Sequence, residues 1–234
     1  MIKFFRSFRK QSIERGKLRQ YLLYALGETI IVVIGILIAL SINNWNNNRI
    51  QRQTEQGVYE KLLRQIEEDR EQLSATLRYN QAQHELLERA KTIVSRGDRQ
   101  QLDTLVRLLP QLYNFSDFHR SGNIYQNLVN SGDYKLLRNA AVTDNIQRLE
   151  ELYIYINRLE ANHFKVIYEY GNTGLVENVN FSTGAVKDPD ALYSFRFENL
   201  LFAFLNITEE KAVAYRRALE VMEGVVGELE GWES

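Results

Sequence analysis

Residues 21–48 read YLLYALGETIIVVIGILIALSINNWNNN, and this stretch decides how the chain is organised. After Glu28 no charged residue interrupts it, and the apolar part covers about 22 residues, or about 33 Å as an α-helix. Because this length crosses the hydrocarbon core of a bilayer, the pattern predicts a transmembrane helix over residues 21–44. Aromatic side chains stand where the two bilayer interfaces are expected, namely Tyr21, Tyr24 and Trp45.

Charge is distributed unevenly on the two sides of this segment. Residues 1–20 carry seven Lys or Arg against one Glu, so the rest of the chain is acidic although the formal net charge is only −1. Basic residues stay on the cytoplasmic side of a membrane helix, which predicts a cytoplasmic head over residues 1–20 and a domain across the membrane over residues 45–234. In a Gram-negative cell this is a single-pass inner-membrane protein with a periplasmic domain. The acidic body argues against nucleic acid as a partner, whereas the lipid bilayer is an expected one.

A cleaved signal peptide is the alternative interpretation of the same segment. Ala39, Leu40 and Ser41 fit a small-x-small cleavage site that follows an apolar stretch. The long basic head, and an acid at Glu28 within the apolar run, favour an anchor that is not cleaved.

The periodicity of the body predicts a helical bundle. Apolar residues recur at helical spacing over residues 54–96 and again over residues 142–170, which predicts two long helices that pack antiparallel. A polar stretch with several glycines predicts an irregular loop over residues 171–190, with room for a short hairpin. The fold class is therefore all-α, with one N-terminal transmembrane helix followed by a periplasmic helical bundle.

Two further helices are expected near the C-terminus. A very apolar stretch predicts a helix over residues 192–205, which is too short to cross a bilayer and fits a core helix. Asn206 and Glu209 have the spacing of a capping box, which predicts that a separate helix starts there and covers residues 208–229.

The membrane segment also carries a resemblance. The block ALGETIIVVIGILIALSINNWNN at residues 25–47, after a basic head, resembles the start of an uncharacterised family of small membrane proteins from Bacteroidota, domain of unknown function 6090. The internal pattern of that family, with Tyr and Leu before Ser-Gly and then Leu-Ile-x-Asn, is similar to Tyr125, Leu128, Ser131, Gly132, Leu136, Leu137 and Asn139. The resemblance extends over most of the chain. It implies a single-pass inner-membrane protein with a periplasmic domain, and it brings no activity with it.

Glu28 is the one acid inside the apolar segment. It lies about 10 Å from the start of the segment, where an ionised carboxylate costs a few kcal/mol unless it is partnered, protonated or able to reach the headgroups. It shares a helix face with Val32, Gly35, Ala39 and Ile42, and the small pair Gly35-x-x-x-Ala39 permits close approach of a second helix. This face predicts a homo-oligomer or an interface with another membrane protein. A carboxylate that merely snorkels and a proton or ion pathway both stay open as alternatives.

The other residue patterns do not predict an enzyme. The chain has no cysteine, and the motifs of zinc peptidases, serine hydrolases, phosphate loops and dinucleotide sites are missing from it. Asp117 and His119 offer two ligands where zinc takes three or four. We therefore expect no catalytic residue and no cofactor.

One pair of residues has the spacing of a di-metal site. Glu160 and His163 are three residues apart on a predicted helix, as in ferritin-like bundles, where a second such pair completes the site. The nearest second pair is Gln81 and His84, in which an amide replaces the bridging carboxylate. We therefore expect no metal, and we interpret His163 as a core histidine on an apolar stripe.

These observations predict a membrane-tethered helical interaction or scaffold protein, such as an accessory subunit of an envelope complex. One alternative is a homo-oligomer in which Glu28 lines an ion or proton pathway. Another is a periplasmic bundle that binds a ligand or a metal.

Overall fold

The longest element is the helix α2, which spans Leu18–Ser95. It belongs to a computed structural model that describes residues 18–120 and 122–231. Most of the predicted basic head, residues 1–20, and the side chain of Tyr21 lie outside the described residues. The chain divides into two units, with the boundary between Gln56 and Gly57, and each unit is described by itself.

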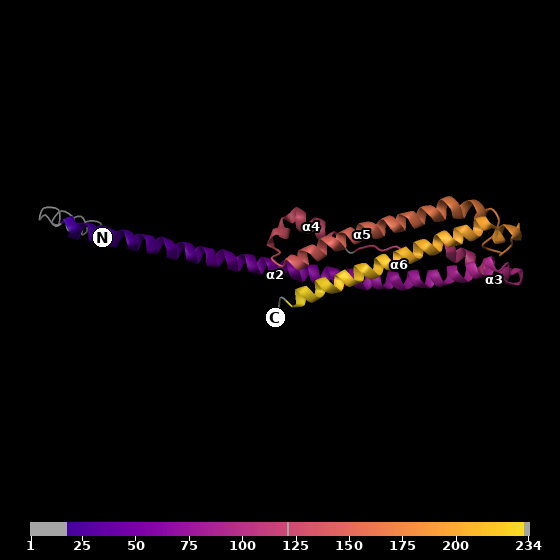
Figure 1. Cartoon of the computed structure of the whole chain (residues 1–234), viewed down its shortest axis with the longest axis horizontal. Helices are drawn as coiled ribbons and strands as arrows, with labels where there is room; N and C mark the ends of the chain where they lie inside the picture. The colour runs from indigo at the N-terminus through magenta and orange to yellow at the C-terminus, as the bar shows by residue number, and fades with distance from the viewer. Residues whose placement is uncertain (1–17, 121, 232–234) are drawn as a thin grey trace. The chain divides into compact units, whose positions relative to one another are not determined.

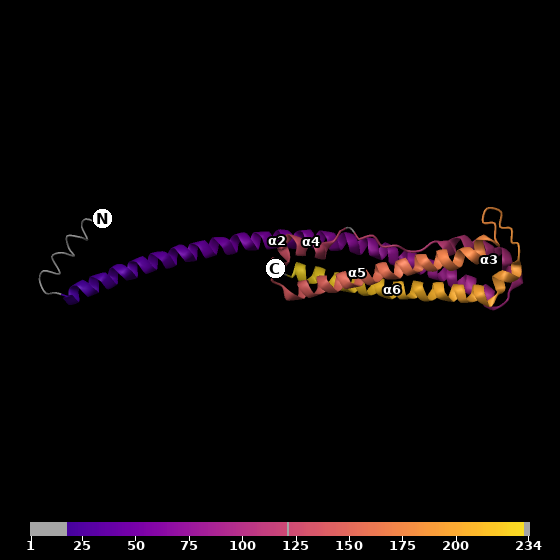
Figure 2. The same ribbon diagram turned by 90° about the horizontal axis from the view of Figure 1, so that it is seen from above.

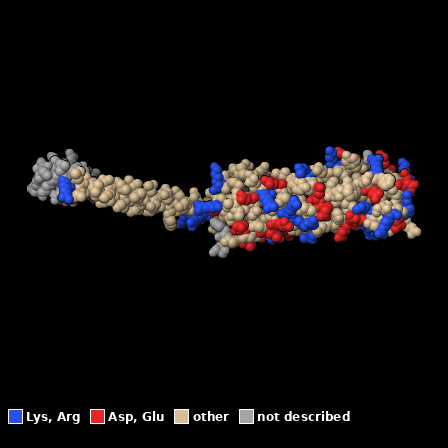
Figure 3. All heavy atoms as spheres, viewed as in Figure 1, with Lys and Arg blue, Asp and Glu red and all other residues tan. Residues whose placement is uncertain are grey.

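In the first unit, α2 carries the segment that the sequence predicts to enter the membrane. Helix formation satisfies the backbone groups internally, as a bilayer requires, and the Thr29 hydroxyl donates to the Ala25 carbonyl at 2.9 Å. Across the described residues, this is the one helix that is long and apolar enough to cross a membrane. In Figure 3 this part of α2 is almost free of charged atoms, whereas both signs of charge cover the second unit.

The second unit is a helical bundle. The part of α2 after Gly57 lies beside α5, Ala140–Val166, and α6, Phe195–Glu230, in both views of the ribbon (Figures 1 and 2). Between α2 and α5 the chain forms short elements, namely η1 Arg99–Gln101, α3 Leu102–Leu108, η2 Leu109–Tyr113, α4 Ile124–Ser131 and η3 Asp133–Leu136. Outside helices, the described residues contain a single isolated β-bridge, between Val179 and Val186. The all-α prediction is thus confirmed.

The C-terminal part differs from the sequence-based prediction of two helices. Residues 195–230 form one continuous helix, α6, so no helix end occurs near residue 206. The Thr208 hydroxyl donates to the carbonyls of Phe204 and Leu205 at 3.0 and 2.9 Å, inside the helix. No proline or glycine interrupts this region, and the apolar side chains of both predicted helices bury on one face. Core packing therefore outweighs the local capping signal.

The end of α5 also differs from the prediction. The α-helix ends at Val166, and the chain continues as a π-helix, η4, over Ile167–Val176, where the sequence predicts α-helix to residue 170 and then a loop. After residues 177–188 comes η5, Pro189–Tyr193, which leads into α6. π-Helices are rare in proteins, and those that occur are frequently found at functional sites. This end of the bundle is therefore a candidate functional site.

The core consists of two apolar clusters that follow one another along the bundle. We call the first the proximal cluster; it takes its side chains from residues 58–77 of α2, 142–159 of α5 and 214–229 of α6. The second, the distal cluster, takes them from residues 87–94 and 105–112 and from residues 167–205. On each of the three long helices, a short polar stretch separates the two clusters.

Candidate functional site

The membrane-helix face predicted from sequence lies on α2. Glu28, Val32, Gly35, Ala39 and Ile42 are all exposed, and no heavy atom comes within 4 Å of a Cβ placed on Gly35. The predicted anchors Tyr24 and Trp45 are also exposed, at 63% and 65% of their surface. The structure therefore leaves this face open to a second helix.

A shallow groove of about 420 Å³ marks one end of this face. Leu23, Tyr24, Gly27, Ile31 and Val32 line it together with Glu28. Gly27 adds a second small residue beside the acid, a contribution that the sequence analysis did not identify. In membrane helices, small residues permit the close approach of a neighbouring helix.

A layer of buried polar side chains separates the proximal and distal clusters. We call it the polar layer; its members are Asn80, Gln83, His84, Ser116, Glu160, His163, Thr208 and Lys211. All of them except His84 are buried, and burial of so many polar groups is costly unless they are hydrogen-bonded to one another. The distances within the layer show which of these groups are hydrogen-bonded.

Lys211 is the central cation of the polar layer and is completely buried. Its Nζ donates to the Ser116 carbonyl at 2.6 Å and lies 3.4 Å from Nδ1 of His163. Burial lowers the pKa of Lys211 to about 8, although the negative charge of Glu160 acts to raise it. Burial, together with the charge of Lys211, lowers the pKa of His163 to about 3, so His163 is neutral at physiological pH.

Glu160 is the buried acid of the same layer. Its Oε1 accepts from the Tyr215 hydroxyl at 2.6 Å and from the Phe118 backbone N–H at 2.9 Å. Its Oε2 is buried and has no hydrogen-bond partner among the described residues. Burial raises the pKa of Glu160 to about 7, although Tyr215 and Lys211 act in the opposite direction.

The polar layer holds the connector, residues 114–123, which links η2 to α4 and has no regular structure around Ser116. The Ser116 hydroxyl donates to Asn80 Oδ1 at 2.9 Å, and Asn80 Nδ2 donates to the Thr208 carbonyl at 2.7 Å. Lys211 and Glu160 satisfy the Ser116 carbonyl and the Phe118 N–H, two backbone groups of the connector that no helix or strand satisfies. The layer thus ties the connector to α2, α5 and α6.

The predicted metal candidates occupy different surroundings. His163 is a core histidine beside an ammonium group, and Lys211 would repel a cation there. His84 Nδ1 lies 2.9 Å from the Thr208 hydroxyl, whereas Gln81 is exposed. No group of three or more potential ligands comes together in the part of the chain that the structure describes.

Asp117 and His119 are both exposed in the connector. The His119 ring nitrogen Nδ1 lies 3.7 Å from Asp117 Oδ2, with no third ligand group placed beside them among the described residues. Sequence reasoning missed Lys211, although one signal was present. Lys211 falls on the apolar stripe of α6 between Thr208 and Tyr215, where a solvated lysine would be out of place.

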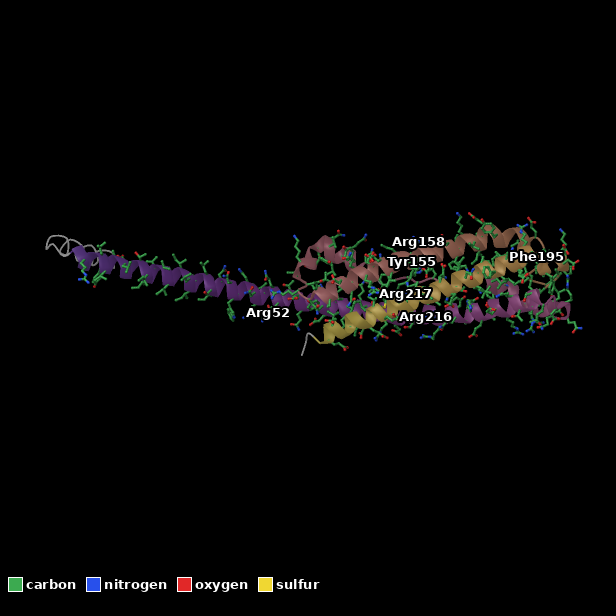
Figure 4. All side chains as sticks on the ribbon, in the orientation of Figure 1. Arg52, Tyr155, Arg158, Phe195, Arg216 and Arg217 are labelled. Atoms are coloured by element: carbon green, nitrogen blue, oxygen red, sulfur yellow. The ribbon has the colours of Figure 1, made fainter. Side chains whose placement is uncertain are left out.

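A pocket of about 610 Å³ lies at the start of α6, in the distal part of the bundle. We call it the tip pocket. Its floor is apolar and includes Leu175, Leu192 and Phe197, which are buried side chains of the distal cluster. The walls come from the π-helix η4, from residues 177–188, from η5 and from the first turns of α6. Figure 4 labels Phe195 at this end of the bundle, where α6 begins.

Residues 28–179 match the family of unknown function DUF6090, and so more than half of the chain is covered. The chain belongs to the DUF6090 family. The match includes the membrane segment from Glu28 onward, the connector and α5. It stops before α6, so Lys211 and most of the tip-pocket lining lie outside it. No curated protein and no solved structure matches the chain.

Proposed function

We propose that this DUF6090 protein is a membrane-tethered interaction module that associates through its membrane helix and presents the helical bundle to the periplasm. The role is positional rather than catalytic. The observation that carries the proposal is the exposed face of Glu28, Gly35 and Ala39 on a helix that is long and apolar enough to cross a membrane.

Helix association in a bilayer explains both features of that face. The open side of Gly35 lets two backbones approach closely, and close approach provides the van der Waals contact that drives association in lipid. Glu28 then lies at a helix–helix interface, where it can hydrogen-bond to a polar group of the neighbouring helix. We propose a second copy of the chain as that neighbour.

The orientation follows from charge. The seven basic residues of the head favour a cytoplasmic N-terminus in the inner membrane, with residues 45–234 in the periplasm. Because the chain has no cysteine, single cysteines provide a clean test of this topology. A membrane-impermeant maleimide added to spheroplasts should label a Ser95→Cys variant and leave a Ser7→Cys variant unlabelled. The opposite pattern would reverse the proposed orientation.

Self-association is tested on the full chain, extracted together with its lipid in a polymer nanodisc. Mass photometry should give one fixed oligomer, which Gly35→Leu and Glu28→Ala dissociate by about fivefold or more, since such helix contacts are worth about 1 kcal/mol. Ser41→Leu on the opposite face of α2 is the matched control and should leave the oligomer intact. A monomeric particle would rule out the proposed interface.

The same sample distinguishes this proposal from two alternatives, a different membrane partner and a cleaved signal peptide. A different membrane protein at fixed stoichiometry would replace the second copy as the partner of the Glu28 face. Release of the chain without its first 39 to 41 residues, seen by intact mass, would show a cleaved signal peptide instead of an anchor.

A further inference from the structure

The tip pocket combines an apolar floor with a charged rim. The floor side chains Leu175 and Leu192 are each only 1% exposed, and Leu200 and Ala203 of α6 continue the same apolar lining. A pocket of about 610 Å³ falls in the size range of small-molecule sites in proteins. The half-buried side chains Leu200 and Ala203 keep apolar surface that an occupant of the pocket would cover.

The rim carries charges of both signs. Lys187 and Arg196 supply two cations, and Glu177 and Asp188 supply two carboxylates. The Asp188 carboxylate is already engaged, because it accepts from the Asp190 N–H at 3.0 Å and caps η5. Lys187 and Glu177 make no hydrogen bond or ion pair with side chains of the described part of the chain. Arg196 already has a partner within the chain. The Lys187 ammonium and the Glu177 carboxylate are therefore the rim charges that are available to a ligand.

The rim is held in place before any ligand arrives. Asn178 cross-links its two sides, because its Oδ1 accepts from the Asp188 N–H at 2.6 Å and its Nδ2 donates to the Asp188 carbonyl at 2.7 Å. The Lys187 N–H donates to the Asn178 carbonyl at 2.8 Å. A preformed site binds more tightly, because less ordering of the protein is required on binding.

η5 is anchored as well. Arg99 pairs with Asp190 at 2.5 Å, and the Tyr193 hydroxyl donates to the Asp98 carbonyl at 2.8 Å. These contacts tie the wall of the tip pocket to the end of α2 and to η1. Both the floor and the rim are therefore built on fixed elements.

From this geometry we propose that the tip pocket binds a zwitterionic amphiphile, an apolar chain with a head group that carries one cation and one anion, such as a phosphoethanolamine lipid. The apolar chain lies against Leu200 and Ala203, above the buried floor of the pocket. The phosphate of the head group pairs with Lys187, and its ammonium pairs with Glu177. This inference concerns the tip pocket alone and is independent of how the membrane helices associate.

The test uses the full chain in phosphatidylglycerol nanodiscs, which offer no zwitterionic competitor. Four photoreactive probes share a twelve-carbon chain and differ only in the head group, which is phosphoethanolamine, sulfate, trimethylammonium or maltoside. After irradiation, mass spectrometry locates the adducts. Peptides from residues 166–203 should carry up to about fivefold more of the phosphoethanolamine probe than of each other probe, since an exposed charge contact adds at most about 1 kcal/mol.

Two variants make the result specific to the tip pocket. Ala203→Trp fills the pocket and should abolish the labelling, whereas Ala161→Trp, at an exposed alanine on α5, should not.

The rim charges are tested separately. Lys187→Glu should remove the head-group preference, and the exchange variant Lys187→Glu/Glu177→Lys should restore it. Circular dichroism confirms that each variant is folded.

Three outcomes would overturn the proposal. Equal labelling by all four probes would show that the rim charges do not contribute to binding. Adducts confined to residues 22–42 would show that the probes only sample the bilayer. Labelling that survives Ala203→Trp would place the ligand outside the tip pocket.

Discussion

The Nζ of Lys211 lies 2.6 Å from the carbonyl oxygen of Ser116, so a completely buried cation on α6 binds the backbone of the connector. The opposing acid, Glu160, binds the same connector two residues further along, at the N–H of Phe118. The two charges thus clamp one irregular segment across the middle of the bundle. This arrangement explains how a chain can carry a lysine and a glutamate inside its core.

Removal of one member of this clamp should destabilise the bundle strongly. Lys211→Met leaves the buried Ser116 carbonyl without its hydrogen-bond donor, and an unsatisfied buried polar group costs about 1–3 kcal/mol. We expect that loss in the free energy of unfolding of the second unit, measured by denaturant titration at pH 7. The exposed lysine variant Lys135→Met is the control and should change it by less than about 0.5 kcal/mol.

The double variant Lys211→Met/Glu160→Gln tests whether the two charges act together. Because neither residue then leaves an uncompensated charge, the double variant should lose less stability than Lys211→Met alone. Strictly additive losses from the two substitutions would contradict the coupling.

Glu160 should make the bundle less stable as pH rises through the weakly acidic range. Its pKa is raised to about 7 in the folded state, so between about pH 4.5 and 7 the folded state holds a proton that the unfolded state has lost. The stability that Glu160 contributes is therefore highest below this window and decreases across it. Glu160→Gln should remove the decrease, measured as the free energy of unfolding at several pH values.

The shifted pKa of His163 changes stability with pH in the opposite direction, so the experiment needs a separate control for it. Because its pKa is lowered to about 3, the unfolded state holds more protons between about pH 3 and 6.5, and stability rises with pH there. The Glu160 effect is therefore best measured in a His163→Gln background. A flat profile in that background with Glu160 present would contradict its raised pKa.

A second buried contact joins α5 to α2. The Tyr153 hydroxyl donates to Asp69 Oδ2 at 2.9 Å, and Asp69 is completely buried. Tyr153→Phe should lower the free energy of unfolding by about 1–3 kcal/mol, because a hydrogen bond to a buried charge is lost. Tyr155→Phe, at a half-buried tyrosine of the same helix, should have little effect. Equal effects of the two substitutions would show that the Asp69 contact contributes nothing.

Two glycines should respond to alanine in opposite directions. Gly132 has φ +78° at the end of α4, where alanine is strained, so Gly132→Ala should cost about 1 kcal/mol. Gly57 lies within α2 with no atom near its missing Cβ, so Gly57→Ala should stabilise the chain by up to about 1 kcal/mol. Thermal unfolding of the two variants side by side gives the comparison.

The sequence by itself determined the features that depend on local chemistry. The apolar run after Glu28 forms one helix because its length, its composition and the absence of proline all favour it. The turn after α4 needs a residue with positive φ, and Gly132 provides it because glycine has no Cβ. The all-α fold class follows from the helical periodicity of the long apolar stripes.

Only the tertiary structure decided the rest, because it depends on contacts between residues far apart in the chain. Lys211 and Ser116 are 95 positions apart, and no local pattern pairs a lysine with one backbone carbonyl. Burial against α5 and α2 also keeps α6 continuous past Asn206, where a local capping signal predicts an end. The tip pocket forms where four segments come together, namely η4, residues 177–188, η5 and α6. Sequence periodicity does not predict which segments of a chain come together in the fold.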